Sequence, residues 1–107
     1  MRIEKKYLHT GIPVPAKMDG MTYMEPLRVW IANNTDWGIE YLYWEKDTPC
    51  AHRMVAEAHV AFEVADVEQA VKESGGQVLL PTMSLGGTCQ LAFVSIPGGP
   101  VVEFFHP

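Results

Sequence analysis

The chain has 107 residues, enough for one domain. Apolar residues make up 48% and charged residues 20%, a composition that excludes a disordered chain. Eight basic and 13 acidic residues give a net charge of −5, which argues against nucleic acid or an anionic membrane as a partner. The apolar runs are too short to span a bilayer, and residues 1–6 carry no apolar signal segment. We therefore expect a cytoplasmic protein.

The two cysteines, Cys50 and Cys89, are too few for a disulfide framework and lack the spacing of a zinc site. Neither has a histidine or another base beside it in a pattern typical of a catalytic nucleophile. We interpret both as plain, buried or half-buried thiols, in agreement with a reducing compartment.

The first half of the chain is predicted to be mostly β-structure. Residues 15–26 (PAKMDGMTYMEP) contain prolines, a glycine and no helical period, which indicates a loop or irregular arm. A turn is expected at residues 33–36 and a polar linker at residues 46–57. The strands are predicted where β-branched and aromatic residues gather, at residues 3–14, 27–32 and 38–45.

The second half is predicted to have the order β-α-β-β-β. After a strand at residues 58–64, Asp66 is the expected helix N-cap, with Gln69 at the capping-box position. Apolar residues then follow at helical spacing until Gly75 and Gly76 end the helix. Three further strands are expected, at residues 77–81, 89–96 and 101–105, with turns at 84–88 and 97–100.

The two halves of the chain resemble each other. Each opens with a histidine-bearing strand, at His9 and His59, and closes with a glutamate-bearing strand, at Glu40 and Glu103. The two pairs are 31 and 44 residues apart, and the difference of 13 residues matches one short helix with its turn. We infer that the first half lacks its helix and has the arm of residues 15–26 in its place.

This repeat has chemical content. A glutamate within the apolar strand at residues 101–105 is costly if it points unpaired into a dry interior. If four strands curl around a common cavity, two histidines and two glutamates can converge on one divalent ion. That cation would offset the desolvation of both carboxylates.

At these residues the chain resembles the vicinal oxygen chelate superfamily. The superfamily includes glyoxalase I, methylmalonyl-CoA epimerase, extradiol dioxygenases and the fosfomycin- and bleomycin-resistance proteins. The resemblance covers nearly all of residues 58–107 and the strands, but not the arm, of residues 3–45. The segments that carry it are His9–Val14 (HTGIPV), His59–Asp66 (HVAFEVAD) and Ile96–Glu103 (IPGGPVVE).

The resemblance implies an α+β fold in which two βαβββ-type modules form a cupped sheet. The chain would be a single glyoxalase-like domain over residues 1–107. Its first module, residues 1–48, would be shortened and lack its helix, and its second would span residues 58–107. Because the reduced first module would expose apolar sheet, we expect a homodimer.

The resemblance also implies a metal site and a reaction. The ligands of the metal would be His9, Glu40, His59 and Glu103, a set that suits Ni, Co, Zn or Mn. The reaction would be proton abstraction next to a carbonyl of a small-molecule substrate, as in lactoylglutathione lyase-like or epimerase-like enzymes. The catalytic base would be Glu103 or Glu40, with Glu103 preferred.

Two other functions stay open at this stage. A non-catalytic protein similar to the bleomycin-resistance branch would bind an apolar small molecule without turning it over. A ring-cleaving dioxygenase is less favoured, because the iron of that branch takes two histidines and one glutamate. The complete set of two histidines and two glutamates therefore favours the isomerase or lyase.

The remaining notable side chains have plainer interpretations. His52 and His106 are expected at the surface, and Met18, Met21 and Met24 of the arm are expected to pack or to cover a sheet face. Trp44 shares a strand face with Glu40 and is the aromatic residue expected to line the cavity. The basic residues that could hold an anionic substrate are scattered, at Lys17, Arg28 and Arg53.

Overall fold

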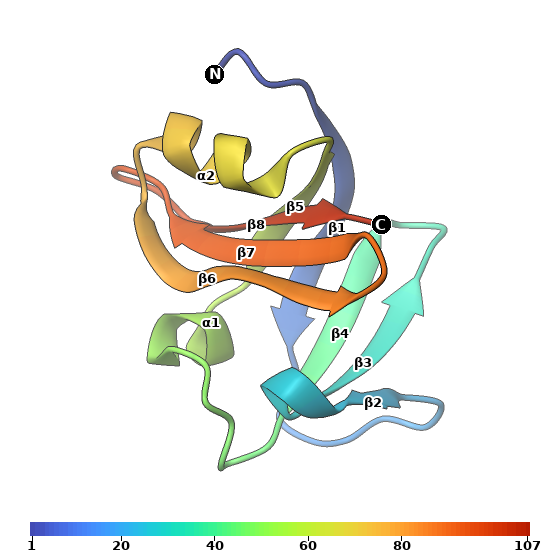
Figure 1. The fold of residues 1–107 in the computed structure, drawn as a ribbon. Coiled ribbons are helices and arrows are strands. Elements are labelled where there is room, and N and C mark those ends of the chain that lie inside the picture. The colour runs from blue at the N-terminus through green and yellow to red at the C-terminus, as the bar shows by residue number, and fades with distance from the viewer.

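The structure is a computed structural model that describes residues 1–107. Its eight strands form one mixed sheet, which curls into a half-barrel (Figure 1). This confirms the α+β cupped sheet. None of the helices has the length and apolar character needed to cross a membrane.

In chain order the elements are β1 Lys5–Pro13, β2 Thr22–Met24, the 3-10 helix η1 Glu25–Leu27, β3 Val29–Asn34, β4 Ile39–Trp44, α1 His52–Ala56, β5 His59–Val64, α2 Val67–Ser74, β6 Gln77–Gly86, β7 Cys89–Ser95 and β8 Val101–His106.

The strand order β2-β3-β4-β1-β5-β8-β7-β6 joins two similar sets of four strands. In each set the histidine-bearing strand runs parallel to the glutamate-bearing strand, β1 beside β4 and β5 beside β8. The two sets meet where β1 pairs antiparallel with β5. The four strands that carry the predicted site are therefore the four central strands of the sheet.

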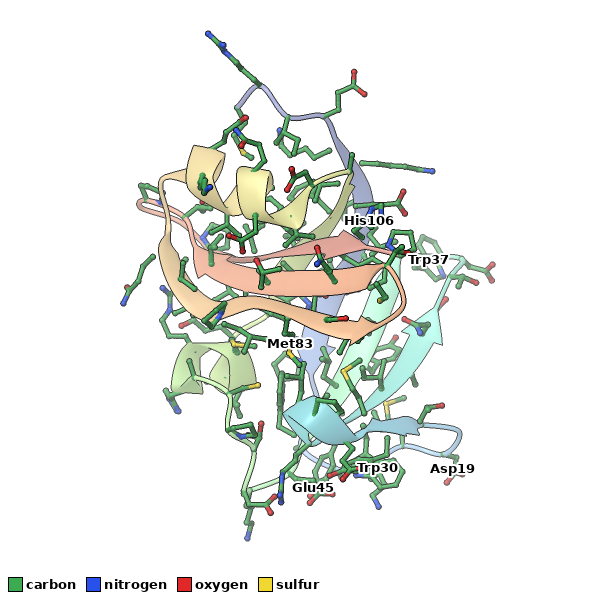
Figure 2. The ribbon with its side chains drawn as sticks, viewed as in Figure 1. Asp19, Trp30, Trp37, Glu45, Met83 and His106 are labelled. Atoms are coloured by element: carbon green, nitrogen blue, oxygen red, sulfur yellow. The ribbon has the colours of Figure 1, made fainter.

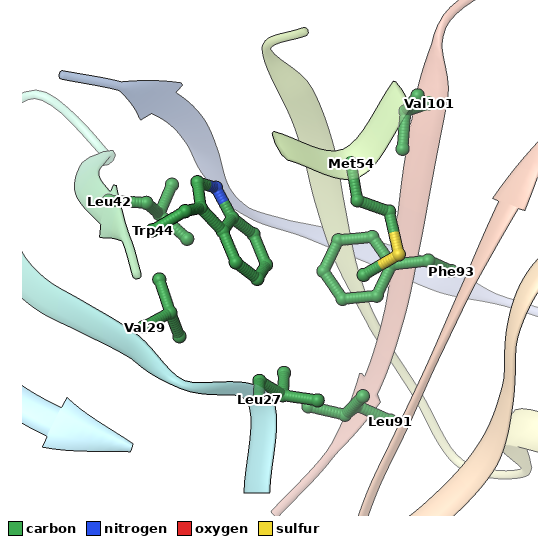
Figure 3. Close-up of a cluster of buried hydrophobic side chains, with 8 residues drawn as sticks. All are labelled: Leu27, Val29, Leu42, Trp44, Met54, Leu91, Phe93 and Val101. Atoms are coloured by element: carbon green, nitrogen blue, oxygen red, sulfur yellow. The ribbon is translucent and has the colours of Figure 1, made fainter. Parts of the chain in front are cut away.

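The core consists of two clusters, one on each face of the sheet. Along β7, Leu91 and Phe93 point into the cup, whereas Ala92 and Val94 point to the opposite face, as strand alternation requires. The outer cluster packs α2 onto β7 and β8 (Figure 1). The inner cluster, shown in Figure 3, consists of Leu27, Val29, Leu42, Trp44, Met54, Leu91, Phe93 and Val101.

Helix α2 begins and ends where the sequence predicts. The Asp66 side chain accepts a hydrogen bond of 3.0 Å from the Gln69 amide, which satisfies one free donor of the first turn. The Gln69 side chain donates instead to Glu73, at 2.8 Å, so the reciprocal bond of a capping box is not made. Gly75 ends the helix with a φ of 65°, a conformation that favours glycine.

The arm of residues 15–26 is more regular than predicted, because its end forms β2 and the start of η1. Several contacts hold it against β3. The Lys17 ammonium lies 3.9 Å from the centre of the Trp30 ring. The centres of the Tyr23 and Trp30 rings are 4.9 Å apart. The Trp30 indole donates to Glu45 at 2.7 Å, and both side chains lie at the arm's end of the molecule (Figure 2).

Three other predictions need correction. The polar linker contains α1, whose Met54 is fully buried in the inner cluster, and this tertiary contact outweighs the polar composition of the segment. Strand β3 is shifted to Val29–Asn34, because Leu27 belongs to η1 and the strand continues to pair with β4 as far as Asn34. Strand β6 runs further than expected, to Gly86, because it continues to pair with β7. His106 is half-buried, and its Nδ1 donates to the Val64 carbonyl at 3.1 Å. His52 is exposed, as predicted.

Candidate metal centre

The structure brings all four predicted site residues together. His9, Glu40, His59 and Glu103 each offer one ligand atom, and these atoms all lie within 4.8 Å of one another. Each residue comes from a different strand among the four central ones. No two of the four are neighbours in the sequence, so the cluster exists only because the strands pair in this order.

The register of the central strands explains the convergence. Gly11 pairs with Glu40 on one side and with His59 on the other. Ala61 pairs with His9 on one side and with Glu103 on the other. Because paired residues point to the same face, all four functional side chains project from one face of the sheet. They form two rows across the strands, and each row has a small residue in its middle: Gly11 in one and Ala61 in the other.

Gly11 is required by the close approach of His59. A Cβ atom at this position would lie 2.0 Å from Cε1 and 2.5 Å from Nε2 of the His59 ring. The ring occupies the space that any other residue would fill. A β-bulge between Tyr7 and His9 shifts the register of β1 at the other histidine.

The polar atoms of the centre are close but not aligned with one another. His9 Nε2 lies 3.4 Å from a carboxylate oxygen of Glu40 and 3.4 Å from one of Glu103, and His59 Nε2 lies 3.1 Å from that Glu103 oxygen. Despite these distances, both buried Nε2 atoms lack a hydrogen bond of acceptable geometry. Two unpartnered imidazole nitrogens facing two carboxylates are a donor set that fits a divalent transition metal.

Within the centre, the pKa shifts favour a protonated His9 beside an ionised Glu103. Burial alone would lower the pKa of His9, but the carboxylates of Glu103 and Glu40 hold that pKa above its ordinary value. Burial raises the pKa of Glu40 against the opposing effect of His9. Burial would also raise the pKa of Glu103, but His59 and His9 beside it keep that pKa below its usual value. Glu103 is therefore the carboxylate that the two histidines stabilise as an anion.

A cavity of about 240 Å³ opens from this centre into the cup. His9, Glu40 and Glu103 form part of its wall, whereas His59 is only 2% exposed and does not. Trp44 lines the cavity, as predicted. Of the methionines in the arm, Met24 reaches the cavity and Met18 and Met21 do not. The complete lining is Leu8, His9, Met24, Leu27, Val29, Ile31, Asn33, Glu40, Leu42, Trp44, Leu85, Leu91, Phe93, Glu103 and Phe105.

One polar residue of the wall was missed at the sequence level. Asn33 was expected in a turn, but it lies in β3 directly opposite Glu40. The signal that could have found it is alternation, since Val29, Ile31 and Asn33 occupy every second position of one strand.

A curled mixed sheet with two histidines and two glutamates converging inside its cup defines the class: a small domain with a candidate metal centre. Among solved structures, a hypothetical protein from Bacillus halodurans C-125 has a similar fold. It is 25% identical, with a TM-score of 0.68, over 96% of this chain and 94% of that chain. No model of a protein family matches the chain, and a search of curated proteins finds no match. The similarity supports the fold and carries no activity with it.

Proposed function

We propose that this protein is a small metal-dependent isomerase or lyase of the vicinal oxygen chelate type. The observation that carries the proposal is the meeting of four ligand atoms within 4.8 Å, from four strands and two halves of the chain. A cavity for a small molecule adjoins three of the four residues. A centre and an adjoining pocket are the two parts that such a reaction requires.

The proposal includes the modular interpretation of the fold. Residues 1–48 would correspond to a first module in which the arm, β2 and η1 replace the helix between β1 and β3. Residues 58–107 would correspond to a second module, in which α2 connects β5 to β6. The parallel pairing of β1 with β4 and of β5 with β8 supports this correspondence.

His9, His59, Glu40 and Glu103 would hold a divalent ion such as Ni, Co, Zn or Mn. When bound, the ion would polarise a carbonyl oxygen and make the neighbouring C–H bond more acidic. The two histidines bind as neutral imidazoles, and the two carboxylates supply the compensating negative charge. The mostly apolar lining would lower the polarity of the place where the proton is moved.

One of the two glutamates would remove the proton. Sequence resemblance favours Glu103, but the geometry gives a stronger argument for Glu40. Glu103 contacts both histidines, and its side chain is 7% exposed, so it is the more firmly held ligand. The Glu40 side chain is 14% exposed, contacts one histidine, and lies at the wall next to Asn33. We therefore assign the proton transfer to Glu40.

The first experiment measures metal content in protein purified without an affinity tag or chelator. We expect one equivalent of a divalent transition metal, lost in Glu103→Ala and His9→Ala. The matched controls are Glu63→Ala, on the neighbouring strand β5, and His52→Ala, at the surface, and both should retain the metal. Protein that contains no metal and shows no thermal shift with Ni, Co, Mn or Zn would overturn the proposal.

A binding protein without catalysis is the second candidate function. The observation that favours it is the lining of the cavity, in which 11 of 15 residues are hydrophobic. Glu40→Gln separates the two functions. In an enzyme this variant should lose turnover of a bound hemithioacetal or acyl-CoA thioester, whereas in a binding protein no turnover is present to lose.

The homodimer stays a prediction, and sedimentation equilibrium tests it.

A further inference from the structure

The two halves of the sheet differ at the residue that stands opposite each glutamate. In the first half Asn33 of β3 pairs with Glu40, and in the second half Phe93 of β7 pairs with Glu103. Because directly paired residues point to the same face, each of the two faces the cup beside its glutamate. The internal repeat therefore places an amide at one of these positions and a phenyl ring at the other.

The phenyl ring of the second half supports a histidine. Phe93 is 3% exposed and belongs to the inner cluster with Met54 (Figure 3). Its ring packs edge to face with the His59 ring, and the ring centres are 5.0 Å apart. Glu103 needs no support from β7, because it lies 3.1 Å from one histidine and 3.4 Å from the other. Its carboxylate is thus oriented by groups within the centre.

Glu40 has fewer contacts of this kind. It lies 3.4 Å from one histidine, His9, and its side chain is 14% exposed, against 7% for Glu103. A carboxylate with one such neighbour is free to rotate about its side-chain bonds. Carboxylates that bind metals are ordinarily held by a further hydrogen bond from a neighbouring group. The residue opposite Glu40 is an amide, which can donate that bond.

The place of Asn33 in the cavity wall suits this role. Four of the 15 lining residues are not hydrophobic, and Asn33 is the one among them that does not belong to the metal centre. It also lines two further hollows beside the cavity, one of them together with Glu40 and the other together with His9. Because Asn33 is exposed, it stands at the rim of the centre. Opposite Cβ atoms are about 4.5–5.5 Å apart, a distance that an amide and a carboxylate can bridge.

We propose that Asn33 is a positioning residue for Glu40. In the metal-loaded protein its side-chain amide donates a hydrogen bond to one oxygen of the Glu40 carboxylate, while the other oxygen is the ligand. When Glu40 carries a proton, the amide oxygen of Asn33 accepts a hydrogen bond from the carboxyl O–H, so Asn33 holds Glu40 in both protonation states. The inference rests on the proposed function and extends it, because it names the residue that keeps the proton-transferring carboxylate in place.

The first test compares the cobalt affinities of two matched variants, measured by competition titration of Co²⁺. Asn33→Leu keeps the branched shape of the side chain and removes the donor. It should weaken cobalt binding by about three- to tenfold, a factor limited by water that competes for an exposed amide. Asn34→Leu is the control, since Asn34 pairs with Ile39 and does not line the cavity. It should change the affinity by less than about twofold.

The second test asks whether Asn33 acts through Glu40. Asn33→Leu is repeated in protein that carries Glu40→Ala, which keeps both histidines and Glu103. With no carboxylate left to hold, the substitution should change the affinity by less than about twofold, so the two effects are not additive. Thermal unfolding of the metal-free variants checks the fold. Asn33→Val, with a side chain that favours strands, takes the place of a leucine variant that does not fold.

The outcomes separate this inference from the proposed function. A loss of cobalt affinity with Asn33→Leu that disappears in the Glu40→Ala background supports the inference. Unchanged affinity with Asn33→Leu, an equal loss with Asn34→Leu, or an equal loss in both backgrounds overturns it. Equal losses in both backgrounds would assign Asn33 to folding or to direct binding of the metal. Wild-type protein that does not hold cobalt overturns the proposed function, and this inference with it.

Discussion

The two halves of the molecule place equivalent residues in different surroundings. In the second half, Phe104 follows Glu103 in β8 and is 1% exposed, because α2 covers that face of the sheet. In the first half, Tyr41 follows Glu40 in β4 and is only half-buried. Both halves nevertheless contribute one histidine and one glutamate to the same centre.

This difference separates what builds the site from what stabilises the fold. The ligands depend on strand pairing and register, which both halves share. The helix acts on the opposite face of the sheet, where it buries apolar surface and touches none of the four ligands. The absence of a helix between β1 and β3 is therefore compatible with the convergence of the four ligand atoms.

The largest expected effect comes from the outer core. Phe104→Ala should lower the free energy of unfolding by about 3–5 kcal/mol, because it removes a fully buried ring under α2. Tyr41→Ala, at the equivalent position of the first half, should cost about 1 kcal/mol, as expected away from a packed core. Chemical denaturation of both variants measures the contrast. Equal losses would mean that the uncovered face of the first half is packed in solution.

The next effect concerns the two small residues between the ligands. Gly11→Ala should destabilise the protein by about 1–3 kcal/mol and abolish metal binding, because the new Cβ occupies the space of the His59 ring. Ala61, in the corresponding place of the other row, already carries a Cβ and is fully buried. Ala61→Gly should therefore keep the metal. Thermal unfolding measures the loss of stability in each variant, and metal analysis measures the loss of metal binding. Metal-replete Gly11→Ala protein would contradict the assigned geometry.

Metal binding should weaken as the pH falls. In the metal-free protein the pKa of His9 is above its ordinary value of 6.5, and only the neutral imidazole binds a metal. The loss of metal affinity should therefore begin above pH 6.5 as the pH falls. It should reach about tenfold per pH unit, because the metal displaces one proton from His9. Competition titrations between about pH 8 and pH 6 measure it. An affinity that stays constant over this range would contradict the role of His9 as a ligand.

The smallest effect concerns the cap of α2. Asp66→Ala removes the hydrogen bond to the Gln69 amide and should cost about 1 kcal/mol. Because α2 lies on the face opposite to the cavity, metal affinity measured well below the unfolding temperature should not change. A parallel loss of metal affinity would show that the helix and the centre are coupled, contrary to the comparison of the two halves.

The strands and the site residues were predictable because their signals are local or repeated. Alternating apolar residues predicted seven of the eight strands, and the repeated pairs, His9 with Glu40 and His59 with Glu103, predicted the four residues that converge in the cup. Helix α1 was missed because it has no capping side chain and five residues, and only the burial of Met54 in the finished core explains it. Strand β2 has three residues in a segment rich in proline and methionine, so its pairing with β3 decides its conformation.

The cavity could be predicted only in part. Trp44 was found through alternation from Glu40. The other lining residues were not, because they depend on which residues of β3, β7 and β8 the curled sheet brings around the cup. The role of Gly11 was equally hidden, since it follows from the position of a ring on another strand.

Strand β8 is the last strand in the sequence, yet it lies between β5 and β7 in the sheet. It carries Glu103, the one carboxylate that contacts both histidines. The centre therefore stays incomplete until β8 has inserted between strands that were synthesised earlier. Metal uptake would then be a late event in folding. An ion once bound would link β1, β4, β5 and β8 and stabilise their pairing.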